Sequence, residues 1–477
     1  MKSFAGWQSA RCGRAATPRL WLLRCAGRCE MIRAQFTFPR GFLWGTASAA
    51  HQVEGGDALS DWKAWEAEPG RVLGAHTSAR ACEWLQGRYI EDFDRAAADG
   101  HNAQRLSVEW ARIEPEPGRW DAAALQFYRA QLLALRARNI TPMVTLCHFT
   151  QPLWFMERGG WETPACIPLF ERYVQKVAAE LGDLCSLWCT INEPNAYMFA
   201  AYVAGVFPPG RHNLLLAQQV HLNQLRAHAA AYHALHAARP DARVGWAQYL
   251  RGFEAARPGF PPDRWAAHWQ HQLFNMGWVN AVHSGRFRML QRSVPVPECR
   301  GTCDWLGVNY YTRDLVAFDL RHPLELFGRR HFAPDDVLSE QGFIASHPAG
   351  LFRALGEMQK FGWPMFVTEN GVEDAPDNMR PAYLLEHLRA LWQAVCFNFP
   401  VHGYFHWSLV DNFEWERGWT QRFGLYALDV DTQVRTPRSS AKLYAEICRA
   451  NAISAEIAQR YAPPVAASMF PGAVLAG

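Results

Sequence analysis

The sequence is poor in charged residues and carries almost no excess of either sign. Asp, Glu, Lys and Arg make up 19% of the 477 residues, and 48 Lys and Arg stand against 45 Asp and Glu, a formal net charge of +3. This balance argues against binding to nucleic acid or another polyanion. The hydrophobic content of 49% argues against a disordered chain and indicates a globular protein.

Other missing features exclude whole classes of protein. No run approaches the ~18 apolar residues of a membrane span. The 12 cysteines form no metal-binding or disulfide framework, since their close pairs are C-x3-C without a matching second pair (Cys25/Cys29, Cys185/Cys189 and Cys299/Cys303). We expect mostly buried thiols in a reducing compartment, the cytoplasm. Neither G-x-G-x-x-G nor a P-loop follows any apolar run, so no nucleotide site is predicted.

Aromatic residues, by contrast, are abundant. The chain has 28 Phe, 21 Trp and 14 Tyr. Tryptophan packs large cores and also stacks on the faces of sugars, and composition alone does not separate these two uses.

Eight short apolar runs recur after residue 41, with helical patterns between several of them. The runs are residues 42–49, 103–110, 140–149, 187–194, 242–249, 303–311, 365–371 and 401–409. Residues 121–138 and 168–181 carry apolar side chains at helical spacing, the first behind an N-cap at Asp121 and the second before a C-cap at Gly182. This alternation predicts parallel strands with right-handed crossovers, closed into one (β/α)8 TIM barrel. A doubly wound sheet is the alternative, disfavoured by the missing phosphate-binding motifs.

The barrel domain is predicted over residues 36–461, with its longest insertions at 250–302 and 312–348. Residues 1–35 contain one acid, Glu30, and seven basic residues, Lys2, Arg11, Arg14, Arg19, Arg24, Arg28 and Arg33. This composition fits either an organelle-type presequence or an upstream start codon before Met31. Residues 462–477 lose all periodicity and are predicted to be a mobile tail.

Two glutamates stand directly after apolar strand cores. Glu193 follows LWCTIN and Glu369 follows MFVT. Barrels of this kind place their chemistry at the carboxyl ends of the strands, and a buried ionised carboxylate is costly unless it is paired or used. Polar groups end or follow most of the other runs as well, which predicts a polar site at one mouth of the barrel.

Paired carboxylates among aromatic and uncharged hydrogen-bonding groups suit the cleavage of a glycosidic bond. One carboxyl must be protonated to donate to the leaving oxygen, and the other must be anionic to meet the oxocarbenium-like carbon. Arg105 would keep Glu369 ionised, and Tyr311 would orient it by donating its phenolic proton. Asn192 offers a hydrogen bond to a sugar hydroxyl.

Seven segments carry these residues: FLWGTASAAHQVEGG, RLSVEWARIEP, HFTQPLW, TINEPN, GVNYYT, VTENG and HWSLVDNFEWERGWTQRFGL. In order and spacing they resemble the signature segments of glycoside hydrolase family 1, the β-glucosidase family. The resemblance runs from Phe36 to Tyr461.

The resemblance implies a (β/α)8 barrel that hydrolyses terminal non-reducing β-D-glucosyl residues, and also galactosyl and fucosyl residues, with retention through a covalent glycosyl-enzyme intermediate. Glu193 would be the general acid/base and Glu369 the nucleophile, with Arg105 and Tyr311 beside it. The family's sugar-binding positions map onto Gln52, His148, Asn192, Asn309, Glu414 and Trp415, with Trp407 as a hydrophobic platform. Retention implies carboxyl groups about 5–5.5 Å apart.

The resemblance also sets expectations for ligands. No metal or organic cofactor is expected, and the partners are small β-glycosides or short oligosaccharides such as those from cellulose. Nucleic acid and membrane are not expected as partners, and the sequence leaves a monomer and a homo-oligomer both open. The loops at 195–213, 250–302 and 312–348 would set the aglycone preference.

Two positions depart from the family pattern. Phe149 stands where members often have Trp, and His51 where Tyr or Phe often precedes the glutamine. We expect both changes to affect substrate preference and the pH profile. Among the tryptophans, we expect Trp407 and Trp415 against the sugar, Trp154 and Trp419 as loop contributors, and those inside strand runs in the core (Trp44, Trp110, Trp188, Trp246 and Trp305).

Two alternative functions are weighed against this one. A 6-phospho-β-glycosidase needs a cationic phosphate clamp after the last strand, where this chain has the acidic Glu414. A non-catalytic carbohydrate-binding relative typically lacks one of the two catalytic glutamates, and both are present here.

Overall fold

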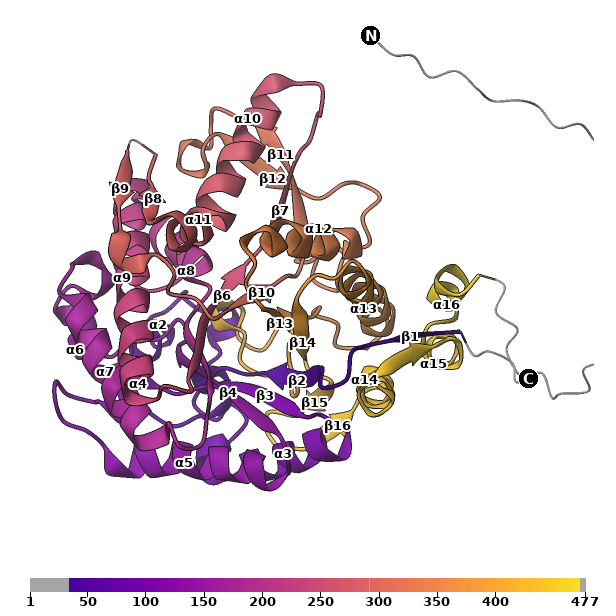
Figure 1. Cartoon of the computed structure of the whole chain (residues 1–477), viewed down its shortest axis with the longest axis horizontal. Coiled ribbons are helices and arrows are strands. Elements are labelled where there is room, and N and C mark those ends of the chain that lie inside the picture. Colours follow the sequence, from indigo (N-terminus) through magenta and orange to yellow (C-terminus); the bar gives the residue numbers. More distant parts are fainter. Residues whose placement is uncertain (1–33, 291, 472–477) are drawn as a thin grey trace, which may run out of the picture. The chain divides into compact units, whose positions relative to one another are not determined.

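The computed structural model describes residues 34–290 and 292–471, and its centre is a closed barrel of eight parallel strands (Figure 1). Each barrel strand pairs with the next barrel strand along the chain, and the last pairs with the first. All eight predicted runs form these strands: β2 (Leu43–Ala47), β3 (Ala103–Ser107), β4 (Thr141–Cys147), β5 (Leu187–Asn192), β6 (Arg243–Tyr249), β10 (Trp305–Asn309), β13 (Met365–Asn370) and β14 (Val401–His406). The barrel prediction is confirmed.

Helices cover the outside of the barrel and connect its strands. The longer ones are α3 (Tyr89–Ala98), α5 (Ala122–Ala137), α7 (Cys166–Leu181), α9 (Leu214–Ala238), α11 (Gly277–Ser284), α12 (Pro348–Met358), α13 (Arg380–Cys396) and α14 (Ser439–Ala450). α8 (Pro194–Tyr202) is of similar length to α11, and the short helices are α1 (Ala50–Val53), α2 (Asp61–Glu66), α4 (Trp110–Ile113) and α6 (Leu153–Glu157). Both predicted helices are confirmed as α5 and α7, and the Asp121 carboxylate caps α5 by accepting from the Ala124 amide at 2.9 Å.

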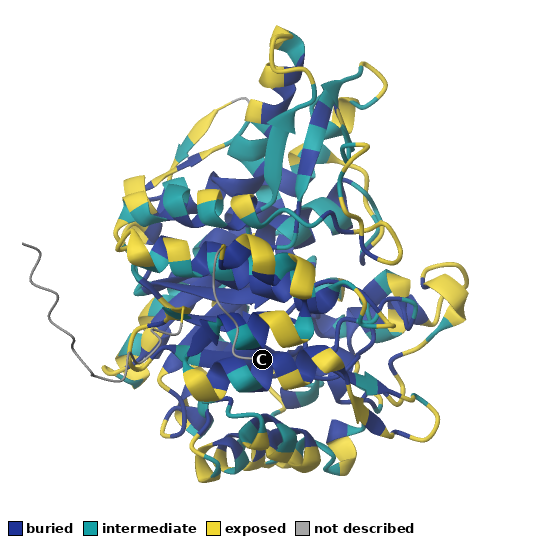
Figure 2. Ribbon diagram, turned by 90° about the vertical axis from the view of Figure 1, so that its right-hand side faces the viewer, coloured by how far each residue is buried: buried dark blue, intermediate teal, exposed yellow. Residues whose placement is uncertain are grey.

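The barrel strands are apolar because they are buried on both faces. Every residue of β3, β5, β10 and β13 is buried, as Figure 2 shows for the dark blue strands at the centre. Position 245 in β6 requires glycine because the neighbouring strand β10 passes close to it: a Cβ there would lie 2.0 Å from the Trp305 carbonyl oxygen. Trp44, Trp110, Trp188, Trp246 and Trp305 are all fully buried in the core, as predicted.

A small second sheet follows the carboxyl ends of β6 and β10. It consists of β7 (Gly252–Ala255), β11 (Arg313–Phe318) and β12 (Gly328–His331), with helix α10 (Pro261–Gln270) packed on it and a π-helical turn at His271–Asn275. In Figure 1 these elements stand at the top of the molecule, and Figure 2 shows them as less buried than the barrel. The two long insertions are therefore an ordered layer beside the barrel mouth.

The C-terminal segment differs from the prediction of a tail without regular structure. Residues Pro463–Met469 form helix α16, and Phe470 stacks on Phe36 with ring centroids 4.5 Å apart. Proline is compatible with the first positions of a helix, so α16 can begin at Pro463. The apolar periodicity of the sequence does not reveal this helix. Residues 472–477 and 1–33 lie outside the described residues. Nearby, β1 (Gln35–Thr37) pairs with β17 (Ala452–Ser454), which leads into α15 (Ala455–Tyr461).

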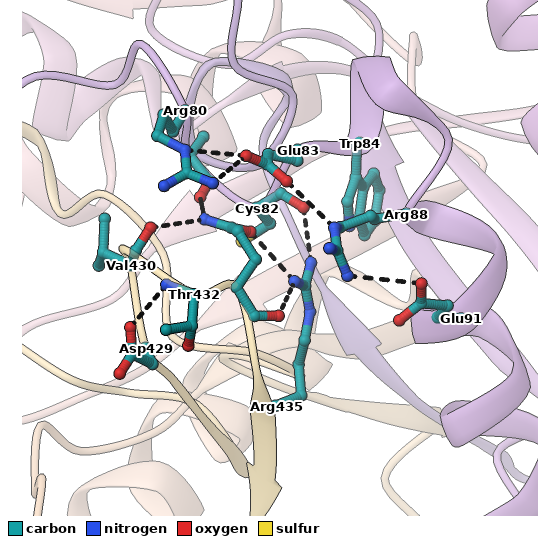
Figure 3. Close-up of polar contacts among 12 residues, drawn as sticks. Arg80, Cys82, Glu83, Trp84, Arg88, Glu91, Asp429, Val430, Thr432 and Arg435 are labelled. Carbon is teal, nitrogen blue, oxygen red and sulfur yellow. Dashed lines mark hydrogen bonds and ion pairs between the residues drawn. The ribbon is translucent and has the colours of Figure 1, made fainter.

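Loops from the two ends of the domain are held together by polar contacts. Arg435, in the hairpin of β15 (Tyr426–Leu428) and β16 (Arg435–Pro437), donates to the Cys82 carbonyl at 2.6 Å (Figure 3). A second contact involves earlier residues of the same two segments: the Trp419 amide donates to His76 at 3.0 Å. The segment after β14 is thereby fixed against the segment after β2, and both lead into the mouth of the barrel.

Two remaining expectations concern membranes and thiols. Within residues 34–290 and 292–471, no helix is long and apolar enough to cross a membrane. The nine cysteines in this part of the chain are all free thiols, and eight of them are buried. β8 (Arg286–Arg288) pairs with β9 (Ser293–Pro295) in a third two-stranded sheet.

Candidate active site

A cavity of about 920 Å³ opens at the carboxyl ends of the barrel strands. Seven of the predicted site residues line it: His148, Glu193, Tyr311, Glu369, Trp407, Glu414 and Trp415. The other four, Gln52, Arg105, Asn192 and Asn309, are buried behind this lining and each bonds to one of its members. The structure therefore brings together all eleven residues to which the sequence gave a catalytic or sugar-binding role.

Glu369, at the end of β13, is held from two directions. Its Oε1 accepts from Arg105 Nη1 at 2.5 Å, and its Oε2 accepts from the Tyr311 hydroxyl at 2.7 Å. Burial raises the pKa of Glu369, while the Arg105 charge and the Tyr311 hydrogen bond lower it. Of the two central carboxyl groups, Glu369 is the one whose ionised form is stabilised.

Glu193 has a different environment. Its Oε1 accepts from Asn309 Nδ2 at 2.8 Å, and no arginine among the described residues is bonded to it. Burial raises the pKa of Glu193 well above its usual value, and the negative charge of Glu369 raises it further. Of the two central carboxyl groups, Glu193 is therefore the one whose protonated form is favoured.

The backbone presents Glu193 to the cavity in a left-handed conformation. Its φ is 42°, and Pro194 begins helix α8 directly after it. Phe149 and Trp415, which also line the cavity, have φ of 71° and 48°. Such conformations cost about 1–3 kcal/mol each in residues other than glycine, and they gather where function fixes a side-chain position.

Arg105 also orders the floor of the site. Its Nη2 donates to Asn192 Oδ1 at 2.6 Å, and Asn192 Nδ2 lies 3.0 Å from His148 Nε2. Burial lowers the pKa of His148 well below its usual value, and the Arg105 charge adds to this effect. His148 is therefore a neutral hydrogen-bonding group beside the carboxyl pair.

Glu414 provides a third carboxyl group in the cavity. Gln52 Nε2 donates to its Oε2 at 3.2 Å and to the Phe413 carbonyl at 2.8 Å. Burial, followed by the charges of Glu416 and Glu369, raises the pKa of Glu414 to about 8. A carboxyl group of this kind bonds pairs of sugar hydroxyls whether it is protonated or ionised, and in its ionised form it repels a phosphate dianion.

Aromatic rings form the walls, and both departures from the family pattern contact Trp415. His51 stacks on the Trp415 ring with centroids 5.6 Å apart and planes 4° apart, and Phe149 meets it edge-on at 5.2 Å. His51 Nε2 lies 3.4 Å from Glu66 on the other side. His51 and Phe149, the two residues that depart from the family pattern, therefore position the Trp415 ring, which is predicted to lie against the sugar.

Several lining residues were missed by the sequence analysis. Tyr249 ends β6 and could have been found, because it occupies the same strand-end position as the residues that were chosen. Trp65, Phe199, Phe207 and Phe274 come from helices and loops whose placement no local pattern predicts. Conversely, Trp154 and Trp419, expected as loop contributors, are absent from the cavity lining, and their indole nitrogens donate to the Glu114 and Thr77 carbonyls.

No cluster of three or more His, Cys, Asp or Glu side chains suited to a metal ion occurs among the residues that the structure describes. What the mouth of the barrel presents is two buried carboxyl groups in unlike environments, among aromatic rings and amides. A (β/α)8 barrel with such a pair belongs to the class of glycoside-cleaving enzymes.

Comparison with known proteins names the family within this class. The model of glycosyl hydrolase family 1 matches residues 34–453. β-Glucosidase A of Thermotoga maritima is 31% identical over 445 residues, covering 87% of this chain and 98% of that protein. The β-glucosidase of Agrobacterium sp. is 33% identical, covering 86% and 95%. The chain belongs to glycosyl hydrolase family 1 and is a glycoside hydrolase.

Solved structures of family members have the same fold. A β-glycosidase from Pyrococcus horikoshii superposes with a TM-score of 0.83 at 34% identity, covering 90% of this chain and 98% of that one. A family 1 glycoside hydrolase of Thermotoga maritima, complexed with a cyclophellitol analogue transition state mimic, has a TM-score of 0.83 at 30% identity, covering 88% and 99%. The prediction of family and fold from the sequence is confirmed.

Proposed function

We propose that this protein is a retaining β-glycosidase that removes terminal β-D-glucosyl residues, with Glu369 as nucleophile and Glu193 as general acid/base. The unlike bonding of the two carboxyl groups carries this assignment. Burial raises the pKa of both carboxyl groups, but Glu369 is bonded by a guanidinium and a phenol, which favour its anion, whereas Glu193 has one neutral amide donor and a pKa raised well above its usual value. The pair therefore supplies one base and one acid at the same pH.

In the first step, the Glu369 carboxylate forms a bond to the anomeric carbon as the bond from this carbon to the aglycone oxygen breaks. Glu193 gives its proton to that oxygen, so the aglycone leaves as a neutral alcohol and the sugar remains as an α-linked ester of Glu369. Arg105 and Tyr311 hold the attacking carboxylate in place through the reaction. This route requires the two carboxyl groups to lie about 5–5.5 Å apart.

In the second step, the ionised Glu193 takes a proton from water, and the water oxygen attacks the anomeric carbon. The ester bond breaks, the β-sugar leaves, and Glu369 is an anion again while Glu193 regains its proton. Esterification removes the negative charge of Glu369, one of the causes that raise the pKa of Glu193. The acid of the first step therefore becomes a stronger acid, whose anion is the base of the second.

Substrate choice is inferred from the far end of the cavity. Glu414 and Gln52 provide hydrogen-bonding groups for hydroxyls of an unphosphorylated sugar, and a carboxyl group that bridges two hydroxyls tolerates glucose, galactose and fucose. Relatives named β-galactosidase, and Thermotoga maritima structures in complex with glucoimidazole and deoxynojirimycin, support small sugar ligands of this kind. Arg417, the nearest cation in the sequence, is 44% exposed and paired with Glu416.

The test is a panel of nitrophenyl β-D-glycosides that compares glucoside, galactoside and fucoside with glucoside 6-phosphate. We expect release from the unphosphorylated glycosides, and rejection of the phosphorylated one because Glu414 stands where a cationic phosphate clamp would be needed. Binding of glucose without release of nitrophenol would instead indicate a non-catalytic carbohydrate-binding protein. A preference for the 6-phosphate would indicate a 6-phospho-β-glycosidase.

A bell-shaped pH dependence of kcat/KM is expected. Activity requires Glu369 ionised and Glu193 protonated, so kcat/KM rises with pH through the pKa of Glu369 and falls through the raised pKa of Glu193. The measurement is kcat/KM for an alkyl glucoside from acid to alkaline pH. In Glu193→Ala, assayed with dinitrophenyl glucoside, which needs no acid, the basic limb should vanish. If the fall in kcat/KM at alkaline pH persists in Glu193→Ala, it would belong to Glu414, whose pKa is raised to about 8.

Tyr311→Phe should move the acid limb of this profile to higher pH. Loss of the 2.7 Å hydrogen bond removes a donor from the Glu369 anion, so its pKa rises. A hydrogen bond to a charged group contributes about 1.5–3 kcal/mol, equivalent to about one to two pH units. Tyr310→Phe is the matched control, because the Tyr310 hydroxyl bonds to the His347 carbonyl instead. An acid limb that moves equally in both variants would contradict the assignment.

A further inference from the structure

Glu66, the last residue of helix α2, is a buried carboxyl group that takes no part in the steps described above. Its side chain is 3% exposed and does not line the cavity. Its Oε1 accepts from Lys63 Nζ at 2.9 Å and from the Ser78 hydroxyl at 3.1 Å, and its Oε2 accepts from the Ser78 amide at 3.0 Å. Burial raises the pKa of Glu66, but His51 and Lys63 together outweigh burial and lower this pKa to about 2. Glu66 is therefore an anion that holds three donors in place.

His51 links Glu66 to the aromatic wall of the site. His51 Nε2 is buried and lies 3.4 Å from Glu66 Oε2. The His51 ring stacks on the Trp415 ring with the two planes 4° apart. Phe149 and Trp62 meet the same ring at 66° and 52°. Parallel rings attract each other at a range of offsets, so the position of Trp415 along this stack depends on what holds His51.

Ser78 provides a second link from Glu66 toward the site. The two residues before Ser78 both bond to Trp419. The His76 ring accepts from the Trp419 amide at 3.0 Å, and the Thr77 carbonyl accepts from the Trp419 indole at 3.2 Å. Because Ser78 is bonded to Glu66 through both its amide and its hydroxyl, Glu66 also anchors the segment that holds Trp419.

Both links reach one short turn, which begins at Glu414, includes Trp415 and ends at Trp419. The turn is closed by a hydrogen bond from the Glu414 amide to the Gly418 carbonyl at 2.7 Å. The φ of Trp415 is 48°, and a strained backbone of this kind persists only where the surrounding structure fixes it. Glu66 supports this strained turn near its beginning and at its end.

We propose that Glu66 is a positioning residue for the sugar-binding turn of residues 414–419. Its carboxylate holds the ring that stacks on Trp415 and the segment that bonds to Trp419. The turn therefore presents Glu414 and Trp415 to the sugar in one position. Loss of the carboxylate removes the anchor that both links share and lets the turn shift. This inference rests on the proposed function and adds to it a determinant of sugar affinity that does not touch the sugar.

The test is inhibition of Glu66→Gln by deoxynojirimycin, a sugar-sized ligand without an aglycone. Glutamine keeps the size of the side chain, but its NH2 group faces hydrogen-bond donors at whichever oxygen it replaces. A shift of the turn by up to about 1 Å should raise the inhibition constant about 10- to 100-fold. KM for nitrophenyl β-D-glucoside should rise with it, and kcat should change much less.

Two readouts separate positioning from a simple loss of folded protein. Partial unfolding lowers the number of active molecules, and with it kcat, but leaves the inhibition constant of the remaining molecules unchanged. The acid and basic limbs of kcat/KM should stay in place, because Glu369 and Glu193 keep their own donors. Glu66→Asp, which keeps the charge, should recover part of the affinity that Glu66→Gln loses.

A second variant tests the link through His51. His51→Phe keeps an aromatic ring on Trp415, and phenylalanine is common at this position in the family, but the new ring has no polar contact with Glu66. It should also raise the inhibition constant. Combined with Glu66→Gln, it should add less than its separate effect, because both substitutions break the same link.

Glu114→Gln is the matched control. Glu114 is fully buried and accepts from the Trp110 indole at 2.9 Å and from the Gly118 amide at 2.6 Å. None of these three residues lines the cavity. This substitution should leave the inhibition constant unchanged, even where it lowers the thermal stability of the protein.

The outcomes separate this inference from the proposed function. An enzyme that hydrolyses glucosides, and whose inhibition constant is unchanged in Glu66→Gln or rises equally in Glu114→Gln, overturns the positioning role alone. A fall in kcat without a change in the inhibition constant also overturns it, since Glu66 would then serve stability only. Failure of the unsubstituted protein to hydrolyse any glucoside would remove the proposed function, and this inference with it.

Discussion

Replacing Glu369 with glycine is expected to lower the hydrolysis of every β-glycoside by at least about 10⁴-fold, because the covalent step loses its nucleophile. Added azide should then restore turnover. The substitution leaves Arg105 Nη1 and the Tyr311 hydroxyl without the acceptor they share, and both groups attract a small anion to the vacated space. The product should be an α-glycosyl azide, since azide attacks from the face that Glu369 occupied.

The stereochemistry of the azide product decides between the two glutamates. Nuclear magnetic resonance distinguishes the α-azide from the β-azide directly. The unsubstituted protein under the same conditions provides the control for reaction of azide with the ordinary intermediate. A β-azide from Glu369→Gly would contradict the assignment and make Glu193 the nucleophile.

Replacing Glu193 with alanine should have the second largest effect, and one that depends on the leaving group. Alkyl glycosides, which need protonation, should lose about 10²–10⁴-fold in rate. Dinitrophenyl glucoside should still form the intermediate rapidly, but water without a base attacks it slowly. Stopped-flow measurements should therefore show a burst of dinitrophenol followed by a slow steady rate, and azide should accelerate that rate and give a β-azide.

Glu109 offers a matched control for this second experiment. It is a buried glutamate whose pKa burial raises to about 7, and it is bonded to Thr150 rather than lining the cavity. Glu109→Gln should keep the dependence on the leaving group unchanged. Equal behaviour of the two variants would show that loss of any buried carboxyl group perturbs the site, and the specific role of Glu193 would be withdrawn.

The barrel and the carboxyl pair were accessible from the sequence for physical reasons. Strands buried on both faces must be apolar throughout, so their runs are visible, and polar residues at their carboxyl ends stand out against that background. Glu193 and Glu369 were found in this way. Tyr249 satisfies the same rule at the end of β6 and is predictable in the same way.

The leaving-group side of the cavity was not accessible in the same way. Phe199 lies on a helix after Glu193, and Phe274 lies in a π-helical turn within a long insertion. Their rings meet only because the β7–β11–β12 layer folds back beside the barrel, which no local period reveals. Helix α16 was missed for a related reason, since seven residues are too few for a helical period to be recognised.

The tryptophan content has a similar division. Trp407, Trp415 and Trp65 line the cavity, whereas eight others are fully buried, including Trp62 and Trp278. Of the 19 tryptophans among the described residues, 11 are buried without lining the cavity, so most of them pack the core of a large barrel and a few rings form the walls of the site.

The central claim is that Glu369 carries the sugar between the two steps. A 2-deoxy-2-fluoro-β-D-glucoside with a dinitrophenyl leaving group slows both steps but leaves the first faster than the second, so the intermediate accumulates. Proteolysis and mass spectrometry of the inactivated protein then locate the sugar. The label should lie on Glu369, within the segment MFVTENG; a label on Glu193, or release of dinitrophenol with no labelled peptide, would contradict the account.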